Sequence, residues 1–319
     1  MDAGGARSSK QSSDRGGPQD APRRSAQSTV SPHTHHGEAV PSARPVQLAD
    51  GTRLTYVEHG DADGVPVILL HGYTDSWRSW ERILPHLPRS LRVFAVTQRG
   101  HGESDKPDGS YDSSVFARDV AAFMDAVGLD RAVLVGHSMG STVAQRFAIE
   151  YPDRTNALVL EGAFMPRPAN AEVAKFLDEV QTLEDPIDPV FVREFQKSTL
   201  AQTVPPGFFD VVVGESLKVP ARVWKAALQP YRTTDFSAGL AEIRVPTLLV
   251  WGDRDTFTGR AEQDALIGSI GGSRLAVYAG AGHSPHWEEP QRFAHQIASF
   301  VAGLLRSESA SLNTVPFQP

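Results

Sequence analysis

Short runs of apolar residues recur along most of the chain, bounded by turn residues or by helical patterns. A continuous apolar run of about four to eight residues is typical of a strand that is buried on both faces of a sheet. Two segments of alternating polarity, 45–48 and 52–58, flank the turn dipeptide Asp50-Gly51 and predict an antiparallel hairpin. The continuous apolar runs are residues 66–70, 92–96, 132–135, 157–160, 247–251 and 275–278.

Helical patterns separate most of these predicted strands. Residues 113–127, 142–150 and 292–305 place apolar side chains at the spacing of one helix face. Strands that alternate with helices indicate the α/β class. We therefore expect a mostly parallel, eight-stranded sheet with helices on both faces.

One interval breaks this alternation. Residues 165–243 hold no good strand pattern, and a structureless connection of that length would be unusual in a folded domain. We expect a helical cap there, inserted into a core made of residues 44–164 and 244–306. The predicted cap helices are residues 171–182, 189–198, 207–217 and 221–228.

Both ends of the chain differ in composition from this core. Residues 1–43 are rich in Ser, Gly, Pro, Arg and Gln, and have too few large apolar groups to offset the entropy of ordering. We expect a disordered tail, or an upstream extension from a misplaced start codon, and a flexible tail at 307–319. Within the first tail, the cluster His33, His35 and His36 is more typical of solvated side chains than of a metal site.

Composition excludes several classes of function. The 319 residues carry a formal net charge of −7 and contain no cysteine, which rules out disulfides and thiolate chemistry and disfavours a nucleic-acid partner. No apolar stretch of about 18 residues predicts a membrane span. No apolar segment follows Arg23-Arg24, as a secretory signal requires. We expect a cytoplasmic protein with no membrane or nucleic-acid partner, either a monomer or a homodimer.

The first chemical motif is Gly136-x-Ser138-x-Gly140, which lies between a predicted strand and a predicted helix. A sharp turn at such a junction exposes a serine hydroxyl at the carboxyl edge of the sheet, and small residues on either side avoid clashes. The amide of Met139 then lies at a helix N-terminus, where it can stabilise an oxyanion. The simpler alternative is that Ser138 only caps the helix.

At this motif the chain resembles the α/β-hydrolase family, over roughly residues 46–305. His71-Gly72-Tyr73 follows a predicted strand as the oxyanion loop of that family does, so the resemblance implies that the Tyr73 amide is a second oxyanion donor. The segment Arg99-Gly100-His101-Gly102 is similar to the family's loop after the next strand. The family often has Asp where this chain has Thr97, and we draw no functional conclusion from that difference.

A serine nucleophile needs an imidazole base and a carboxylate that orients the imidazole. Gly282-His283 matches the family's histidine loop, and Asp255 fits its usual position for the acid. His286 is the alternative base. Glu161, at the end of a predicted strand, is the alternative acid, because haloalkane dehalogenases and some other members take their acid from that position. Asp253 more plausibly serves the loop backbone.

These assignments predict acyl transfer through an acyl-enzyme, with no metal or cofactor, on a small hydrophobic ester or lactone. Haloalkane dehalogenases and epoxide hydrolases are disfavoured because their nucleophile is Asp. Hydrolysis of a C–C bond in a diketone or ring-cleavage product is the first alternative, and cofactor-free haloperoxidase chemistry is a side reaction of the same site. A different class also remains open, a small-molecule sensor built on the same fold.

Aromatic residues near these motifs predict the wall of a substrate pocket. Each of them has core packing as its simpler interpretation. The candidate contacts are His71, Tyr73, Trp77, Phe164 and Trp224, with Phe208, Phe209 and Trp287 as further aromatic candidates.

Overall fold

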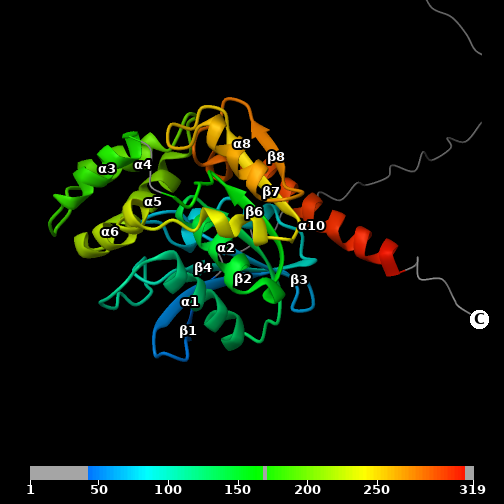
Figure 1. Ribbon diagram of the computed structural model, residues 1–319. Coiled ribbons are helices and arrows are strands. Elements are labelled where there is room, and N and C mark those ends of the chain that lie inside the picture. Colours follow the sequence, from blue (N-terminus) through cyan, green and yellow to red (C-terminus); the bar gives the residue numbers. More distant parts are fainter. Residues whose placement is uncertain (1–41, 168–170, 313–319) are drawn as a thin grey trace, which may run out of the picture. The chain divides into compact units, whose positions relative to one another are not determined.

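A computed structural model describes residues 42–167 and 171–312, and its described strands form one eight-stranded sheet in the order β1-β2-β4-β3-β5-β6-β7-β8 (Figure 1). The pairs β1–β2 and β2–β4 are antiparallel, and all the other pairs are parallel. The predicted hairpin and the mostly parallel sheet are thus confirmed. The strands are β1 (Arg44–Gln47), β2 (Arg53–His59), β3 (Val65–Leu70), β4 (Leu91–Thr97), β5 (Ala132–His137), β6 (Thr155–Glu161), β7 (Thr247–Gly252) and β8 (Arg274–Tyr278).

The central strands are buried on both faces, which explains their continuous apolar sequences. In β3, Ile68 and Leu70 pack into one hydrophobic cluster, whereas Val67 and Leu69 pack into a second cluster on the opposite face. The helices α1 (Ser113–Ala126), α2 (Met139–Glu150) and α8 (Arg260–Ser269) contribute to the first cluster.

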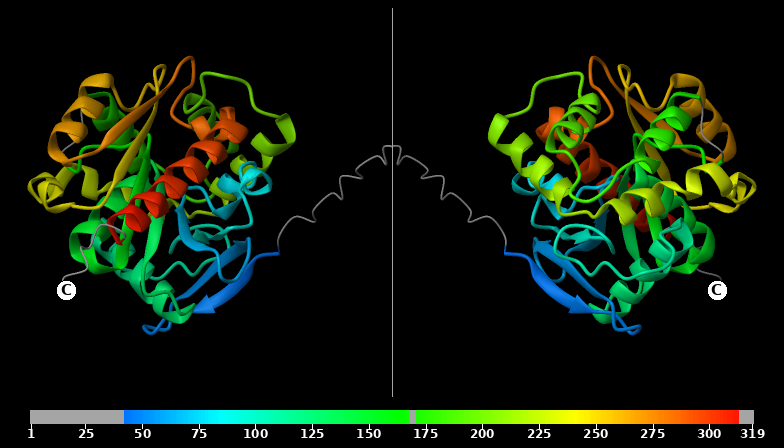
Figure 2. Two further views of the ribbon diagram at one scale, coloured as in Figure 1. Left: turned by 90° about the vertical axis from the view of Figure 1, so that its right-hand side faces the viewer. Right: turned by 90° about the vertical axis from the view of Figure 1, so that its left-hand side faces the viewer.

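The second cluster is covered by the C-terminal part of the chain and by two short 3₁₀ helices, η1 (Trp77–Trp80) and η2 (Leu84–His86). The helix α10 (Pro290–Leu312) supplies Phe293, Ile297 and Phe300 to it. Figure 2 shows α10 in front of the sheet in its left view and largely hidden in its right view.

The predicted helical insert is confirmed between β6 and β7. Asp188 caps α4 by accepting from the amide of Val190, and Pro at the first turn of α4 and α5 suits the fixed φ of a helix start. Figure 1 shows α3 to α6 grouped together, on the side away from α10. The helices of the insert are α3 (Ala171–Gln181), α4 (Pro189–Ser198), α5 (Pro206–Leu217), α6 (Ala221–Leu228), α7 (Pro230–Thr233) and η4 (Ser237–Glu242).

The ends of the chain bear on two further expectations. The tail predicted for 1–43 lies outside the described residues except at its last two positions, and so do His33, His35 and His36. At the other end, α10 continues to Leu312, past residue 306 where the sequence predicted a flexible tail. In the described ranges, no helix has the length and apolarity that crossing a membrane requires.

The candidate catalytic residues all follow the carboxyl ends of parallel strands. Because these ends meet at one edge of the sheet, residues far apart in the sequence come together there. Ser138 follows β5, Asp255 follows β7 and His283 lies in the loop after β8, which continues into the short helix α9 (Pro285–Glu288). The inserted helices leave the sheet from the same edge, after β6.

Candidate active site

Ser138 occupies a strained turn between β5 and α2. Its φ of 52° and ψ of −114° lie where side chains other than glycine are rarely found. A Cβ at Gly136 would lie 2.2 Å from the carbonyl oxygen of Gly140, and a Cβ at Gly140 would lie 2.1 Å from that of Leu70. The two glycines of the motif are therefore required by close backbone approach, as the sequence predicted.

His283 and Asp255 are brought together in one buried pair. Nδ1 of His283 lies 2.7 Å from Oδ2 of Asp255, and the same carboxyl accepts from the hydroxyl and amide of Thr258 and the amide of Phe257. Burial raises the pKa of Asp255, but the His283 charge and these hydrogen bonds outweigh it and hold the pKa below its usual value.

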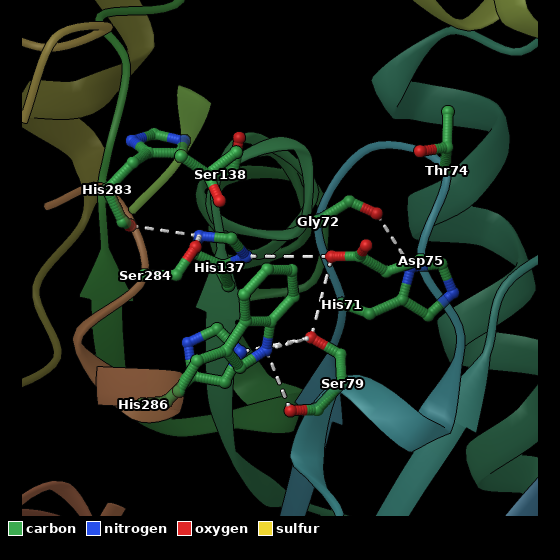
Figure 3. Close-up of polar contacts among 12 residues, drawn as sticks. His71, Gly72, Thr74, Asp75, Ser79, His137, Ser138, His283, Ser284 and His286 are labelled. Carbon is green, nitrogen blue, oxygen red and sulfur yellow. Dashed lines mark hydrogen bonds and ion pairs between the residues drawn. The ribbon is translucent and has the colours of Figure 1, made fainter. Parts of the chain in front are cut away.

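The pKa of His283 moves the opposite way. Burial disfavours the imidazolium, but the charge and hydrogen bond of Asp255 outweigh burial and raise the pKa above its usual value. Figure 3 shows the His283 ring beside Ser138, and both residues line the same cavity. Backbone bonds place the loop of His283: its amide donates to the carbonyl of Thr199 at 2.8 Å, and its carbonyl accepts from Nε2 of His137 at 3.1 Å.

Glu161 and His286, the alternative acid and the alternative base, pair with each other. Oε2 of Glu161 lies 2.9 Å from Nδ1 of His286. On the other side of the ring, Nε2 of His286 lies 3.0 Å from Oγ of Ser79 (Figure 3). Both side chains of the pair have no exposed surface. Burial raises the pKa of Glu161 well above its usual value and lowers that of His286 well below its own.

The two candidate oxyanion donors are backbone amides at the same edge of the sheet. Met139 is the first residue of α2, so its amide has no partner within the helix. Tyr73 follows the His71-Gly72 pair directly after β3. The Tyr73 side chain turns to the insert, where its hydroxyl donates to the carbonyl of Trp224 at 2.7 Å.

A cavity of about 540 Å³ opens next to Ser138 and His283. Its wall is mostly aromatic and apolar, and the inserted helices supply about half of it. This lining fits a small organic ligand. The described lining residues are Tyr73, Asp75, His137, Ser138, Phe164, Val173, Phe176, Phe195, Gln196, Thr199, Leu228, Tyr231, Phe257, His283 and Trp287.

The predicted substrate contacts divide into two groups. Tyr73 and Phe164 line the cavity, but His71, Trp77 and Trp224 do not, which corrects those three predictions. Nδ1 of His71 donates to the carbonyl of Gly72 and Nε2 accepts from the amide of Gln98, so this ring fixes the loop. Trp77 packs on the far face of the sheet, and Trp224 is sealed behind Tyr73 and Phe195.

Of the other aromatic candidates, Trp287 lines the cavity, whereas Phe208 packs against Trp287 and does not. The sequence reasoning did not single out Asp75 and Gln196, two polar residues of the wall. Asp75 stands two positions after Tyr73, and this closeness to the predicted oxyanion loop was the available signal. Gln196 carried no signal, since its partner lies more than a hundred positions away.

The described part of the chain contains no group of three or more His, Asp or Glu side chains arranged to hold a metal ion. The His283–Asp255 pair and the His286–Glu161 pair each join one imidazole to one carboxyl group. Such pairs are suited to moving or holding a proton.

Known proteins that are similar to this chain in sequence include two hydrolases. A hydrolase from Comamonas testosteroni named for 2-hydroxy-6-oxo-6-phenylhexa-2,4-dienoate is 31% identical over 264 residues, which cover 77% of this chain and 90% of that protein. A 2-hydroxy-6-oxononadienedioate/2-hydroxy-6-oxononatrienedioate hydrolase from Burkholderia vietnamiensis is 29% identical, over 83% of this chain and 97% of its own length.

Among solved structures, an esterase from Rhodococcus superposes with a TM-score of 0.73 at 28% identity, over 82% of this chain and 99% of the esterase. Residues 67–296 match the Alpha/beta hydrolase family. This segment contains the core strands from β3 onward together with the insert. The chain therefore belongs to the α/β hydrolase family.

Proposed function

We propose that the protein is a serine hydrolase that acts through an acyl-enzyme on uncharged, hydrophobic carboxylic esters or lactones. One observation carries this proposal: Ser138, held in its strained turn, lines the same largely apolar cavity as His283, whose ring is paired with the buried Asp255. A hydroxyl and an oriented imidazole on one cavity wall are the minimum that acyl transfer needs.

In the proposed mechanism, Oγ of Ser138 attacks the ester carbonyl while His283 takes the hydroxyl proton. Asp255 holds the Nδ1 proton of His283, which leaves Nε2 as the base and stabilises the imidazolium. The amides of Tyr73 and Met139 bind the oxyanion. The C–O bond then breaks, His283 protonates the leaving alcohol, and water activated by His283 hydrolyses the acyl-enzyme.

The cavity wall supports an uncharged substrate. Among its described lining residues there is no Lys or Arg, and Asp75 contributes a buried carboxyl group. A carboxylate on the substrate would lose its hydration there without gaining a cation as partner. The relatives named above are hydrolases of dienoates, which carry carboxylate groups, so the wall favours an ester over such a substrate for this chain.

Hydrolysis of a C–C bond is the second candidate, because the two relatives are named as hydrolases of oxo-dienoates, compounds whose names contain a ketone and no ester. For this chain, a wall without Lys or Arg favours a neutral diketone as the substrate of such a reaction. Turnover of a matched pair, a neutral 1,3-diketone and a p-nitrophenyl ester of the same acyl group, distinguishes the two. Faster kcat/KM for the diketone overturns the ester assignment.

The direct test of the nucleophile is labelling with a fluorophosphonate, followed by mapping of the modified residue. We expect the label on Ser138, and Ser138→Ala to lose both the label and turnover, the latter by a factor of up to ~10⁶. Label on another residue, or none, contradicts the proposal. A sensor would show a single slow turnover with retained product, whereas the hydrolase shows many rapid cycles.

A further inference from the structure

Asp75 is a buried carboxyl group in the substrate cavity that the proposed mechanism does not use. It lies in the loop after β3, is 3% exposed, and lines the cavity together with Ser138. Oδ1 accepts from Nε2 of Gln196 at 3.0 Å, so helix α4 of the insert holds one carboxyl oxygen. Figure 3 shows Ser138 with the His283 ring on one side and the Asp75 carboxyl on the other.

The other oxygen, Oδ2, has only weak hydrogen bonding. The hydroxyl of Ser79 lies 3.5 Å from Oδ2. This hydroxyl has shorter contacts elsewhere, with Nε2 of His286 and Nε1 of Trp287, each at 3.0 Å. At 3.5 Å a hydroxyl–carboxyl bond is near the limit of useful geometry. Oδ2 therefore has bonding capacity left, and both Asp75 and the neighbouring His137 line the cavity.

The environment of Oδ2 favours a proton on it. Nε2 of His137 lies 3.1 Å from the carbonyl oxygen of His283, and because a carbonyl only accepts, this nitrogen carries the hydrogen. Nδ1 of His137 then presents a lone pair, and it lies 4.0 Å from Oδ2 of Asp75 with no hydrogen-bond partner among the described residues. Protonation of the Asp75 carboxyl group removes the repulsion between these two acceptors, Nδ1 of His137 and Oδ2 of Asp75.

The ionisation of Asp75 agrees with this arrangement. Burial is the largest cause and raises the pKa of Asp75 to about 7; the charge of Glu215 adds to the rise. The hydrogen bonds from Gln196 and Ser79 and the charge of His283 oppose it. His137 and His286, the other titratable groups nearby, have pKa values well below the usual one because of burial and are neutral.

We propose that Asp75 is a specificity-determining residue that, as a carboxylic acid, donates a hydrogen bond to a second oxygen of the substrate. This inference rests on the proposed ester hydrolysis and names the class within it. The preferred substrates are uncharged esters whose acyl chain bears a keto, ether or hydroxyl oxygen beyond the scissile carbonyl. The scissile carbonyl itself is held by the amides of Tyr73 and Met139, so it does not compete for Asp75.

Selectivity follows from the protonation state. A protonated Asp75 has only distant acceptors, Oγ of Ser79 at 3.5 Å and Nδ1 of His137 at 4.0 Å, so a substrate without the second oxygen leaves this donor poorly satisfied. Once ionised, Asp75 only accepts, and it repels the lone pairs of a keto oxygen. The preference for the keto substrate therefore decreases as the pH rises through the ionisation of Asp75.

The test compares p-nitrophenyl 4-oxopentanoate with p-nitrophenyl pentanoate, a pair that differs only in the keto oxygen. The quantity measured is the ratio of their kcat/KM values, in which the ionisation of His283 cancels because both esters need it. In the wild type we expect a ratio of about ten at about pH 6, falling toward about one at about pH 8.5.

Two variants separate donation from charge. Asp75→Asn keeps a donor that does not ionise, so its ratio stays raised at both pH values. Asp75→Leu removes the donor, and its ratio is near one throughout. The matched control is Asp108→Asn, a change at a side chain that is 96% exposed, which keeps the wild-type ratio and its pH dependence.

A wild-type ratio near one at low pH, or a ratio that does not change with pH, overturns the proposal. If Asp75→Leu does not fold, the decision rests on Asp75→Asn. A ratio in this variant that falls with rising pH, as in the wild type, would contradict the proposal. The underlying ester hydrolysis is judged separately, by whether Ser138→Ala abolishes turnover of the plain pentanoate ester.

Discussion

Nδ1 of His286 lies 2.9 Å from Oε2 of Glu161, in a pair that is fully buried and that reaches Ser79 on its other side. The chemical order of serine, histidine and carboxylate is that of a catalytic triad. However, Ser79 is only 2% exposed and does not line the cavity next to Ser138. We therefore expect Glu161, the alternative acid, to stabilise the interior beside the site and to take no part in the reaction.

The first prediction concerns the two acids. Glu161→Gln keeps an oxygen for the His286 amide, which bonds Oε1 at 2.8 Å, and gives the imidazole an amide donor. We expect kcat/KM for p-nitrophenyl pentanoate to stay within about tenfold of wild type, whereas Asp255→Asn lowers it by ~10⁴ through loss of the correct imidazole tautomer. The opposite ranking would assign the acid to Glu161.

The matched stability measurement uses Glu161→Ala. This change leaves the His286 amide and ring without their partner in a sealed site, and we expect a loss of about 1–3 kcal/mol in the free energy of unfolding. Urea denaturation measures it, with Glu161→Gln as the control that retains hydrogen bonding. Equal stability of the alanine and glutamine variants would show that the pair does not contribute to the fold.

Local sequence was sufficient to predict most of the fold. The apolar runs at 66–70 and 132–135 correspond to β3 and β5, and the inserted helix predicted at 189–198 begins and ends where α4 does. Helix α8 was not predicted, because its sequence is largely polar and buries only Gln263 and Leu266. The order of strands in the sheet is a long-range property that periodicity does not contain.

The site divides in the same way. Ser138 and the glycines around it are specified by a local turn, and His283 and Asp255 lie in loops that resemble known motifs. The failures are long-range: Asp75 is paired with Gln196, and Glu161 with His286, through contacts between distant segments. His71 was predicted to contact substrate because it adjoins the oxyanion loop, but its ring bonds to the backbone of that loop instead.

The second prediction is a shift in pH dependence. His283 must be neutral to act as a base, and its pKa in the wild type is raised above the usual 6.5, because Asp255 outweighs the lowering effect of burial. Activity should therefore fall as the pH drops, with a midpoint above 6.5. In Asp255→Asn the charge that raises the pKa of His283 is removed, so the residual activity should persist to lower pH than in the wild type. A pH profile of kcat/KM measures this, and Asp108→Asn, at a side chain that is 96% exposed, is the control that keeps the wild-type midpoint.

The third prediction concerns Tyr231, which lines both the cavity next to Ser138 and a second cavity of about 400 Å³. Tyr231→Ala should join the two and move the preferred acyl chain to greater length, with about fourfold in kcat/KM for each added methylene that is buried. Tyr231→Phe is the control: it keeps the ring and loses only the bond to Thr142 at 3.2 Å. A p-nitrophenyl ester series measures the shift, and an unchanged preference in the alanine variant would show that the second cavity does not receive substrate.

The fourth prediction tests how tightly the base is positioned. Gly162 has a φ of 52°, and a Cβ there would lie 2.8 Å from Cε1 and 2.9 Å from Nδ1 of His283. Gly162→Ala should push the ring off Asp255 and lower kcat by ~10², the usual effect of a misplacement of about 1 Å. The control is Gly268→Ala, at a helical glycine whose added Cβ meets nothing within 4 Å, and it should keep wild-type kcat. Thermal melting separates misplacement of the ring from unfolding of the protein. If Gly162→Ala retains both kcat and stability, the His283 ring can move without loss of function. The tight positioning inferred from the Asp255 contact would then be wrong.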